Sequence, residues 1–512
     1  MVMRPYPHPI MPRLTWAYAA DRNHDPFESP IAVTQEGVHI PGSVAARPFS
    51  INARWFVPGF GFVWLTADNE GRLYSADDFR GDRVRNLNVE FARSYVAQNN
   101  GTFQRYSATG TRFSPEVRHL QALAEELLSD ANRYQGEEAG NRANRSLRYS
   151  LLAGEKIEFE QARAVLARPR TDQFYFGCET RQFVWAQSEP TIERFVNVFN
   201  LATVTHYIWD SWYEVFEPRE GVYRWGIKDN IVDTMLENNI TVEGRPLLWF
   251  HPSVTPDWLA QKNYEEVLAY TDNHVQNLVG HYGDKVLKWE VVNEYHDWAN
   301  VHDFSEEQIT NVVRLACERT RDVNPRVERL INNCCPYAEY APGRHAAHGP
   351  SERPLRSPRK FMADLVEAEV PFEVTGIQMY FPQRSIADIV RHVERFAEFG
   401  RPVYITEIGT TSGPTRQEIL TESMTMQGPL FDWRRPWDEE LQADWMEMLY
   451  TIFYSKPYIQ AVNWYDFADF RTFVQNGGLI RENAEPKASY RRLEGLLDEW
   501  GRRPTGRPEG RG

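Results

Sequence analysis

Eight short strand-like segments alternate with helix-like stretches from about residue 173 onward, and this alternation limits the possible folds more than any other feature. The segments are rich in β-branched and aromatic residues, as parallel strands joined by crossover helices are. They are QFYFGC (173–178), TVTHYIW (203–209), GRPLLWF (244–250), VLKWEVVN (286–293), VERLINN (327–333), EVTGIQMYF (373–381), PVYITE (402–407) and IQAVNWYDF (459–467). Eight β/α repeats with no spare strand favour a closed (β/α)8 barrel, an α/β fold whose catalytic groups lie at the C-terminal strand ends.

The first part of the chain has a different pattern. Its strand-like runs SINARWFV, FGFVWLTA and LNVEFARSYVAQ, separated by turn residues, predict a β-rich, sandwich-like domain. A helix is predicted after Ser114 and Pro115, and the polar stretch YQGEEAGNRANRS that follows it predicts a mobile loop. We therefore expect an accessory domain over 1–168, a barrel over 169–500 and a disordered tail over 501–512.

Composition excludes several classes of partner. The net charge of −14 disfavours nucleic acid, because binding to phosphates depends on Lys and Arg. No apolar run reaches the roughly 18 residues of a spanning helix, and the N-terminus lacks the apolar core of a signal peptide. We therefore expect a protein that does not enter the membrane and is cytoplasmic, or secreted with its signal removed.

No nicotinamide or phosphate-binding glycine motif is present, so no cofactor is predicted. The sequence leaves the oligomeric state open.

Two glutamates stand at predicted strand ends. Glu294 directly follows the fourth segment and Glu407 closes the seventh. Cleavage of a glycosidic bond with retention requires a carboxylic acid and a carboxylate about 5 to 5.5 Å apart. We predict that Glu294 is the general acid/base and Glu407 the nucleophile; the alternative is that each is a solvated side chain where a strand meets a loop.

The motifs WEVVNE and ITE around these glutamates resemble the acid/base and nucleophile signatures of glycoside hydrolase family 10, the endo-xylanase family. Further blocks resemble that family in the same order: EPREGVY (217–223), LLWFHPSVTPDW (247–258), GIQ (376–378) and WYDFADF with GGLIRENAEPKASY. The resemblance covers about 173–495. It implies retaining hydrolysis of a β-linked polysaccharide or oligosaccharide through a covalent glycosyl-enzyme, without a metal.

Several other residues receive substrate-binding roles. Asn293 resembles the asparagine that hydrogen-bonds the sugar 2-hydroxyl, although it could instead form a turn. Trp464 would form the apolar floor under the sugar or belong to the core. His251 would donate to a sugar hydroxyl or a carboxylate, or be a polar residue satisfied elsewhere. Trp249 and Gln378 lie in matching blocks and are assigned to the substrate site on the resemblance.

The second strand departs from the family pattern. A lysine that grips the sugar is missing there, and His206 and Trp209 occupy the stretch instead. We predict that both contact substrate and that the sugar specificity has changed. Xylan is then only the family default.

Two further departures concern the third and sixth strands. Arg245 follows the glycine where the family has a histidine, and Tyr380 stands where the family has the histidine that orients the nucleophile. A tyrosine hydroxyl could donate to Glu407 and favour its charged form.

Other functions and roles stay open. The chain could be an exo-acting glycosidase or transglycosylase with a non-xylan substrate, or a carbohydrate-binding barrel without turnover. The loops 336–360 and 410–438 are expected to shape the cleft, with Trp433 and Trp437 either stacking on sugars or packing on the barrel rim. The N-terminal domain could bind carbohydrate through Trp55, Phe60 or Trp64, although burial of these is the commoner state, or could mediate dimerisation.

Overall fold

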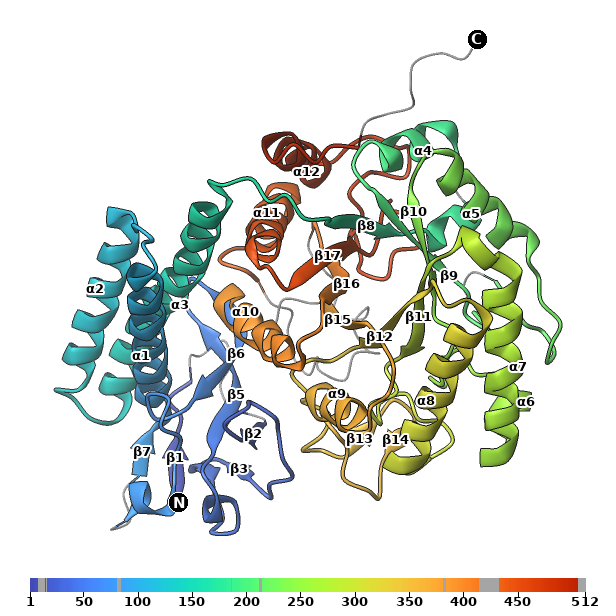
Figure 1. Ribbon diagram of the computed structural model, residues 1–512. Coiled ribbons are helices and arrows are strands. Elements are labelled where there is room, and N and C mark those ends of the chain that lie inside the picture. Colours follow the sequence, from blue (N-terminus) through green and yellow to red (C-terminus); the bar gives the residue numbers. More distant parts are fainter. Residues whose placement is uncertain are drawn as a thin grey trace.

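The computed structural model contains a closed barrel of eight parallel strands, with a smaller domain packed beside it (Figure 1). It describes residues 1–7, 14, 16–80, 84–185, 187–210, 214–380, 384–413 and 432–504. The barrel strands follow one another around the ring in chain order, which confirms the predicted (β/α)8 fold. They are β8 (Tyr175–Glu179), β9 (Leu201–Thr205), β10 (Thr241–Arg245), β11 (Lys288–Asn293), β12 (Glu328–Asn333), β15 (Val374–Tyr380), β16 (Val403–Gly409) and β17 (Ile459–Trp464).

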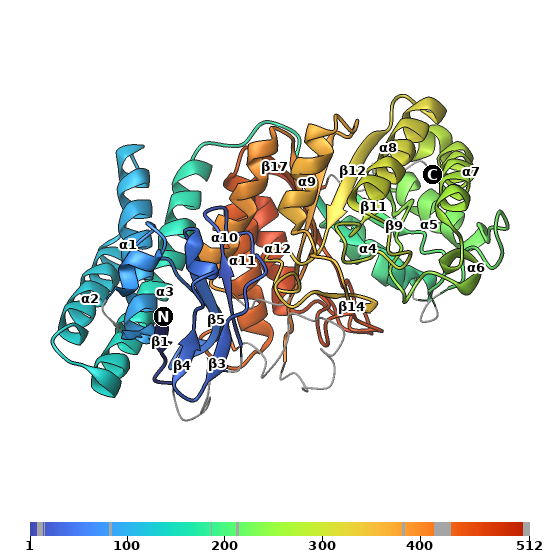
Figure 2. The same cartoon turned by 90° about the horizontal axis from the view of Figure 1, so that it is seen from below.

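One helix follows each barrel strand and covers the outside of the barrel (Figures 1 and 2). Polar residues begin several of them: Asn263 and Glu266 form a reciprocal capping box at α7, as Ser305 and Gln308 do at α8. The eight outer helices are α4 (Glu189–Val196), α5 (Gly226–Glu237), α7 (Tyr264–Tyr282), α8 (Glu306–Val323), α9 (Pro358–Glu367), α10 (Ile386–Glu394), α11 (Glu439–Ser455) and α12 (Ala488–Glu499). A short helix, α6 (Asp257–Ala260), and a hairpin of β13 (His345–Ala346) and β14 (Gly349–Pro350) lie in the loops.

The third barrel strand was predicted too late in the chain. The apolar segment 244–250 was assigned to it, but β10 ends at Arg245. Leu248 and Phe250 instead form isolated bridges to Val292 and Asn300 beyond the strand. The shift places Arg245 at the C-terminal end of the strand, where it reaches the barrel mouth.

The N-terminal domain contains two small sheets and three long helices. One sheet has the order β3-β4-β1-β7 and the other the order β2-β5-β6. The strands are β1 (Val2–Arg4), β2 (Ala17–Ala20), β3 (Ala32–Thr34), β4 (Gly37–His39), β5 (Ser50–Val57), β6 (Gly61–Ala67) and β7 (Val84–Asn86). The helices are α1 (Leu87–Ala108), α2 (Pro115–Ala131) and α3 (Gly136–Leu166). The helix predicted after Ser114 is confirmed, with the Ser114 side chain capping it.

Two expectations for this domain were wrong. The run LNVEFARSYVAQ is not a strand but forms residues 87–98 of α1, which Asn86 caps by accepting a hydrogen bond from the backbone N–H of Val89. The stretch YQGEEAGNRANRS is not a loop, because its residues from Gly136 on begin α3. Small and apolar side chains at helical spacing, such as Ala143 and Leu147, are fully buried, and this packing outweighs the polar composition.

Helix α3 joins the N-terminal domain to the barrel and packs against α10 and α11 (Figure 1). Its buried Glu155 accepts hydrogen bonds from Trp433 Nε1 at 3.0 Å and Arg434 Nη2 at 2.7 Å. Trp433 and Trp437 are 0% and 6% exposed, so they pack at this junction and do not face the cleft. The rest of the loop 410–438 from residue 414 to 431, and the tail from residue 505, lie outside the described residues.

Candidate active site

The structure brings Glu294 and Glu407 together at the C-terminal end of the barrel. Glu294 directly follows β11, and Glu407 lies in β16. Strand β15 connects them: Gln378 Nε2 donates to Glu294 Oε1 at 2.7 Å, and the Tyr380 hydroxyl donates to Glu407 Oε2. Gln378 and Tyr380 are two residues apart on one strand, so their side chains lie on the same face about 7 Å apart along it. The predicted pair therefore faces one shared space at the barrel mouth.

Glu294 lies in a pocket of neutral hydrogen-bond donors. Its side chain accepts from Gln378 Nε2 and from Trp249 Nε1 at 3.0 Å, and the residue is 6% exposed. Burial and the nearby charge of Glu407 raise the pKa of Glu294 to about 7. Asn293 is also buried, and its Oδ1 accepts from Gln378 Nε2 at 3.2 Å. A carboxyl with this pKa can hold a proton near neutral pH and donate it.

The backbone of Glu294 is held in an unusual conformation. Its φ is +57°, in the left-handed region that non-glycine residues avoid. Such a conformation costs about 1 to 3 kcal/mol and persists where the surrounding structure enforces it, which is often at functional sites. Here the Glu294 N–H donates to Asn332 O at 2.9 Å, and Ala299 N donates to Glu294 O at 3.0 Å. These bonds turn the chain sharply after β11 and fix the side chain at the mouth.

Glu407 lies in a pocket that contains a cation. The Arg245 guanidinium donates to Glu407 Oε1, and Asn332 Nδ2 donates to the same oxygen at 3.2 Å. The Tyr380 hydroxyl donates to the other oxygen, Glu407 Oε2, as predicted from the sequence. Glu407 is 4% exposed and thus about as buried as Glu294. One cation and two neutral donors therefore contact the two carboxylate oxygens of Glu407.

Comparison with known proteins places the chain in a family. The model of glycosyl hydrolase family 10 matches residues 166–495, which is more than half of the chain. The chain belongs to glycosyl hydrolase family 10. The resemblance predicted from the motifs around Glu294 and Glu407 is thereby confirmed.

Relatives of the chain in family 10 carry xylanase names. A β-1,4-xylanase of Dictyoglomus thermophilum is 28% identical over 207 residues, which cover 38% of this chain and 53% of the relative. An endo-1,4-β-xylanase B of Thermotoga neapolitana is 24% identical over 335 residues, covering 61% of this chain and 86% of the relative. The chain thus spans about half of the first relative. The crystal structure of xylanase 10B from Thermotoga petrophila in complex with xylobiose has 22% identity and a TM-score of 0.48, covering 64% of this chain and 94% of that one.

The other predicted substrate-binding residues differ in burial and in the groups that they contact. His206 points away from the mouth: it is 1% exposed and its Nε2 lies 3.0 Å from the Tyr282 hydroxyl of α7. Trp464 is fully buried, and its Nε1 donates to Gly477 O at 2.9 Å. His251 stacks beside Trp249 with ring centroids 5.0 Å apart, but its Nδ1 is engaged with Ser253 Oγ at 2.7 Å. Trp209, by contrast, is 38% exposed beyond the end of β9.

Sequence reasoning missed Asn332 and gave Arg245 no role at the site. In the sequence Arg245 is only a departure from the family pattern, yet its guanidinium donates to Glu407 directly. A usable signal was present: charges alternate at the start of the predicted third strand, where Glu243 precedes it and Arg245 lies in it, and within the fourth, as Lys288 with Glu290. Alternate residues of a barrel strand face the interior, where charges are stable only in pairs. Asn332, on β12, carried no such signal.

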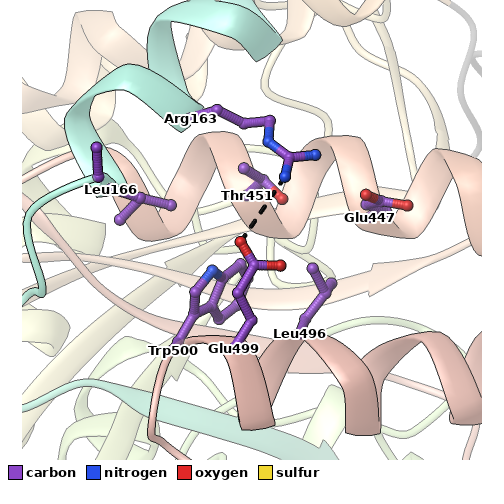
Figure 3. A pocket seen from close by; sticks show the side chains of 8 residues that line it. Arg163, Leu166, Glu447, Thr451, Leu496, Glu499 and Trp500 are labelled. Carbon is purple, nitrogen blue, oxygen red and sulfur yellow. Dashed lines mark ion pairs between the residues drawn. The ribbon is translucent and has the colours of Figure 1, made fainter.

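A small cavity of about 130 Å³ lies away from this chemistry, between the end of α3 and the helices α11 and α12 (Figure 3). Arg163 and Glu499 form an ion pair across it at 3.8 Å, beside Trp500. It is on the outside of the barrel and contains no catalytic group.

In the described part of the chain, no cluster of three or more His, Cys, Asp or Glu side chains could hold a metal ion. Nor is any described helix long and apolar enough to cross a membrane.

Proposed function

We propose that the chain is a retaining glycoside hydrolase that cleaves a β-linked polysaccharide or oligosaccharide. The observation that carries the proposal is the contrast between its two buried carboxyls, one among neutral donors and one beside a cation. A pair of carboxyls whose environments separate their protonation states is the arrangement that retaining hydrolysis requires.

The reaction proceeds in two displacements. Protonated Glu294 donates to the leaving oxygen while Glu407 attacks the anomeric carbon, which gives a covalent glycosyl-enzyme. Glu294, now ionised, then removes a proton from water as the water attacks the same carbon and releases Glu407. Formation of the ester removes the charge of Glu407, so the pKa of Glu294 falls between the two steps, from about 7 in the free enzyme. The same residue is thus an acid first and a base second.

Exposed aromatic rings around the mouth support a carbohydrate as the ligand. Trp185, Trp209 and Phe473 are 55%, 38% and 40% exposed and follow β8, β9 and β17. Flat apolar rings at a polar cleft suit the faces of sugar rings. Since its relatives are named β-1,4-xylanases, xylan is the first polymer to test.

The deciding experiment is hydrolysis of a panel of β-linked polysaccharides and aryl β-glycosides, with the anomeric configuration of the products followed by NMR. We expect retained configuration for the wild type and no turnover for Glu407→Gln. Glu158→Gln is the matched control, since Glu158 is a buried carboxyl of α3, bonded to Tyr106 at 2.9 Å and remote from the mouth. It should keep wild-type turnover.

Each other outcome contradicts part of the proposal. Inverted products would exclude the covalent intermediate, and full activity of Glu407→Gln would exclude the assigned nucleophile. Binding of glycans by the wild type with no turnover on any of them would favour a barrel that only binds carbohydrate.

A further inference from the structure

The Arg245 guanidinium is enclosed by carboxyl groups from three other strands. The residue is 0% exposed. Its Nη2 binds Glu407 Oε1, its Nη1 lies 3.5 Å from Glu179 Oε2, and its Nε lies 3.2 Å from Glu290 Oε2 without hydrogen-bond geometry. One cation is thus shared among three buried acids, and the role of Arg245 depends on which of them are charged.

Glu290 needs the cation least. Burial raises the pKa of Glu290 well above its usual range and so favours its protonated form. Its Oε2 accepts from Asn332 Nδ2 at 3.0 Å, which leaves it well placed without an ion pair.

Glu179 is satisfied largely by other donors. Its Oε1 accepts the backbone N–H groups of Thr180 and Arg181, each at 2.9 Å, and its Oε2 accepts from Thr203 Oγ1 at 3.1 Å. At 3.5 Å, the hydrogen bond of Arg245 to Glu179 is also the longer of the two that the guanidinium makes with the described residues. The short, charge-assisted contact of Arg245 is therefore the one with Glu407.

We propose that Arg245 is a positioning residue that fixes the Glu407 carboxylate and stabilises its charge when the glycosyl-enzyme is hydrolysed. The inference rests on the proposed retaining mechanism. Glu179 anchors the guanidinium from the opposite side, so the cation keeps a charged partner while Glu407 is esterified.

The placement also assigns the two oxygens of Glu407. Oε1 accepts from both Arg245 and Asn332, whereas Oε2 accepts only from the half-buried Tyr380 among the described side chains. Oε2 forms the new bond to the anomeric carbon as the glycosidic electron pair leaves on the oxygen that Glu294 protonates. Oε1 becomes the ester carbonyl and remains bound by Arg245. In the second displacement, water loses its proton to Glu294, and the electron pair of the broken ester bond returns to a carboxylate that Arg245 already contacts.

Charged and titratable groups face this cation from several elements and must be considered in any pH test. Besides the three acids in contact, the neighbours are Tyr207 after β9, Glu243 on β10, Glu294 after β11 and Tyr380 on β15. Burial raises the pKa of Glu243 to about 7, so Glu243 titrates in the same range as Glu294.

The test compares Arg245→Gln and Arg245→Lys with the wild type, using an activated aryl β-glycoside that the wild type hydrolyses. For Arg245→Gln we expect kcat to fall by roughly 10²- to 10³-fold, the scale for losing one preorganised donor to an oxygen on which charge develops. A burst of phenol should precede the steady state because hydrolysis of the ester is slowed. The acidic limb of kcat/KM should move to higher pH, since the ionised nucleophile has lost its cation. Arg245→Lys keeps a positive charge, so it should show a smaller loss of kcat, a smaller burst and a smaller shift of the acidic limb.

Arg384→Lys is the matched control. Arg384 is also buried and paired, with Glu339 at 3.1 Å and the Tyr18 hydroxyl at 2.8 Å, but it lies at the contact between the N-terminal domain and the barrel. This variant should lose stability without a burst and without a shift of the acidic limb. A folded Arg245→Gln enzyme with wild-type kcat, no burst and an unmoved limb would overturn the inference.

If Arg245→Gln does not fold, Glu179→Gln tests the same inference. Glu179→Gln leaves the guanidinium in place but removes a competing charge, so the acidic limb should move to lower pH, opposite to the Arg245 variants. A shift to higher pH, or no shift, would contradict the inference. Activity retained in Glu407→Gln would instead contradict the proposed function, so the two failures are distinguishable.

Discussion

The acid pocket around the proposed acid, Glu294, and the nucleophile pocket around the proposed nucleophile, Glu407, are matched in burial and differ in charge. Glu294 is 6% exposed and Glu407 is 4% exposed. Around Glu294 the described donors are the neutral groups of Trp249 and Gln378, whereas Glu407 also receives the guanidinium of Arg245. Burial alone would favour protonation of both carboxyls. We propose that the single cation separates an acid from a nucleophile, and four changes test this comparison.

The largest effect is expected from Glu294→Gln, which removes the proposed proton donor. Glu294→Gln cannot protonate the leaving oxygen, so kcat/KM on an unactivated glycan should fall by roughly 10²- to 10⁴-fold, the usual contribution of general acid catalysis. The loss should be much smaller on an aryl glycoside whose phenol leaves without protonation. An equal loss on both substrates would mean that Glu294 has a different role.

The second largest effect is expected from Tyr380→Phe, which tests the neutral hydroxyl that donates to Glu407. Tyr380→Phe removes the hydroxyl that donates to Glu407 Oε2. A hydrogen bond to a charged group contributes about 1.5 to 3 kcal/mol, which corresponds to about a tenfold to hundredfold loss in kcat/KM. The acidic limb of the pH profile should move to higher pH because the charged nucleophile is less stabilised.

Tyr95→Phe is the control for this variant. The Tyr95 hydroxyl donates to Asp388 Oδ2 at 2.6 Å between α1 and α10, away from the mouth. Its loss should lower the free energy of unfolding and leave the pH profile unchanged. If both variants lost activity alike without a shift of the limb, the Tyr380 hydroxyl would be only structural.

A third change measures how strongly the two pockets interact. The pKa of Glu294, about 7, is raised first by burial and second by the charge of Glu407. In Glu407→Gln the second cause disappears, so the pKa of Glu294 should be lower than in the wild type. Titration of ¹³C-labelled glutamate by NMR would measure it in both proteins. An unchanged pKa would show that the pockets are electrostatically independent.

The sequence predicted the barrel and the meeting of Glu294 and Glu407 at its mouth because both depend on local patterns. Apolar runs at regular intervals mark the eight strands, and the motifs WEVVNE and ITE mark the strand ends that carry Glu294 and Glu407. The partners of these glutamates depend on contacts between distant strands. Asn332 reaches Glu407 because β12 lies next to β15, which in turn lies next to β16 in the ring, and no local sequence pattern indicates that placement.

Side-chain direction was the other limit of the prediction. His206 and Trp209 were assigned together to the substrate, but His206 packs on Tyr282 outside the strand, while Trp209 is exposed at the mouth. Neighbouring residues of a strand point to opposite faces, and β9 ends at Thr205, so the alternation does not continue through this loop. In the N-terminal domain, α1 and α3 were missed because tertiary packing outweighs the local preferences of their residues.

The smallest of the four effects is expected from Trp249→Phe, which changes only a neutral donor of the acid pocket. The Trp249 indole N–H donates to Glu294 Oε2 at 3.0 Å and stabilises its ionised form, so removing it should raise the pKa of Glu294. Glu294 must be protonated for the first displacement; the basic limb of kcat/KM should therefore move to higher pH. The shift should be modest because Gln378 still donates, and a phenyl ring retains the contact with Tyr207, whose centroid lies 4.7 Å away. Trp445→Phe is the control, since Trp445 Nε1 has no hydrogen-bond partner among the described residues and lies in α11. A limb that moved to lower pH would mean that the indole stabilises the protonated acid, and neutral donors alone would then not explain how this pocket differs from that of Glu407.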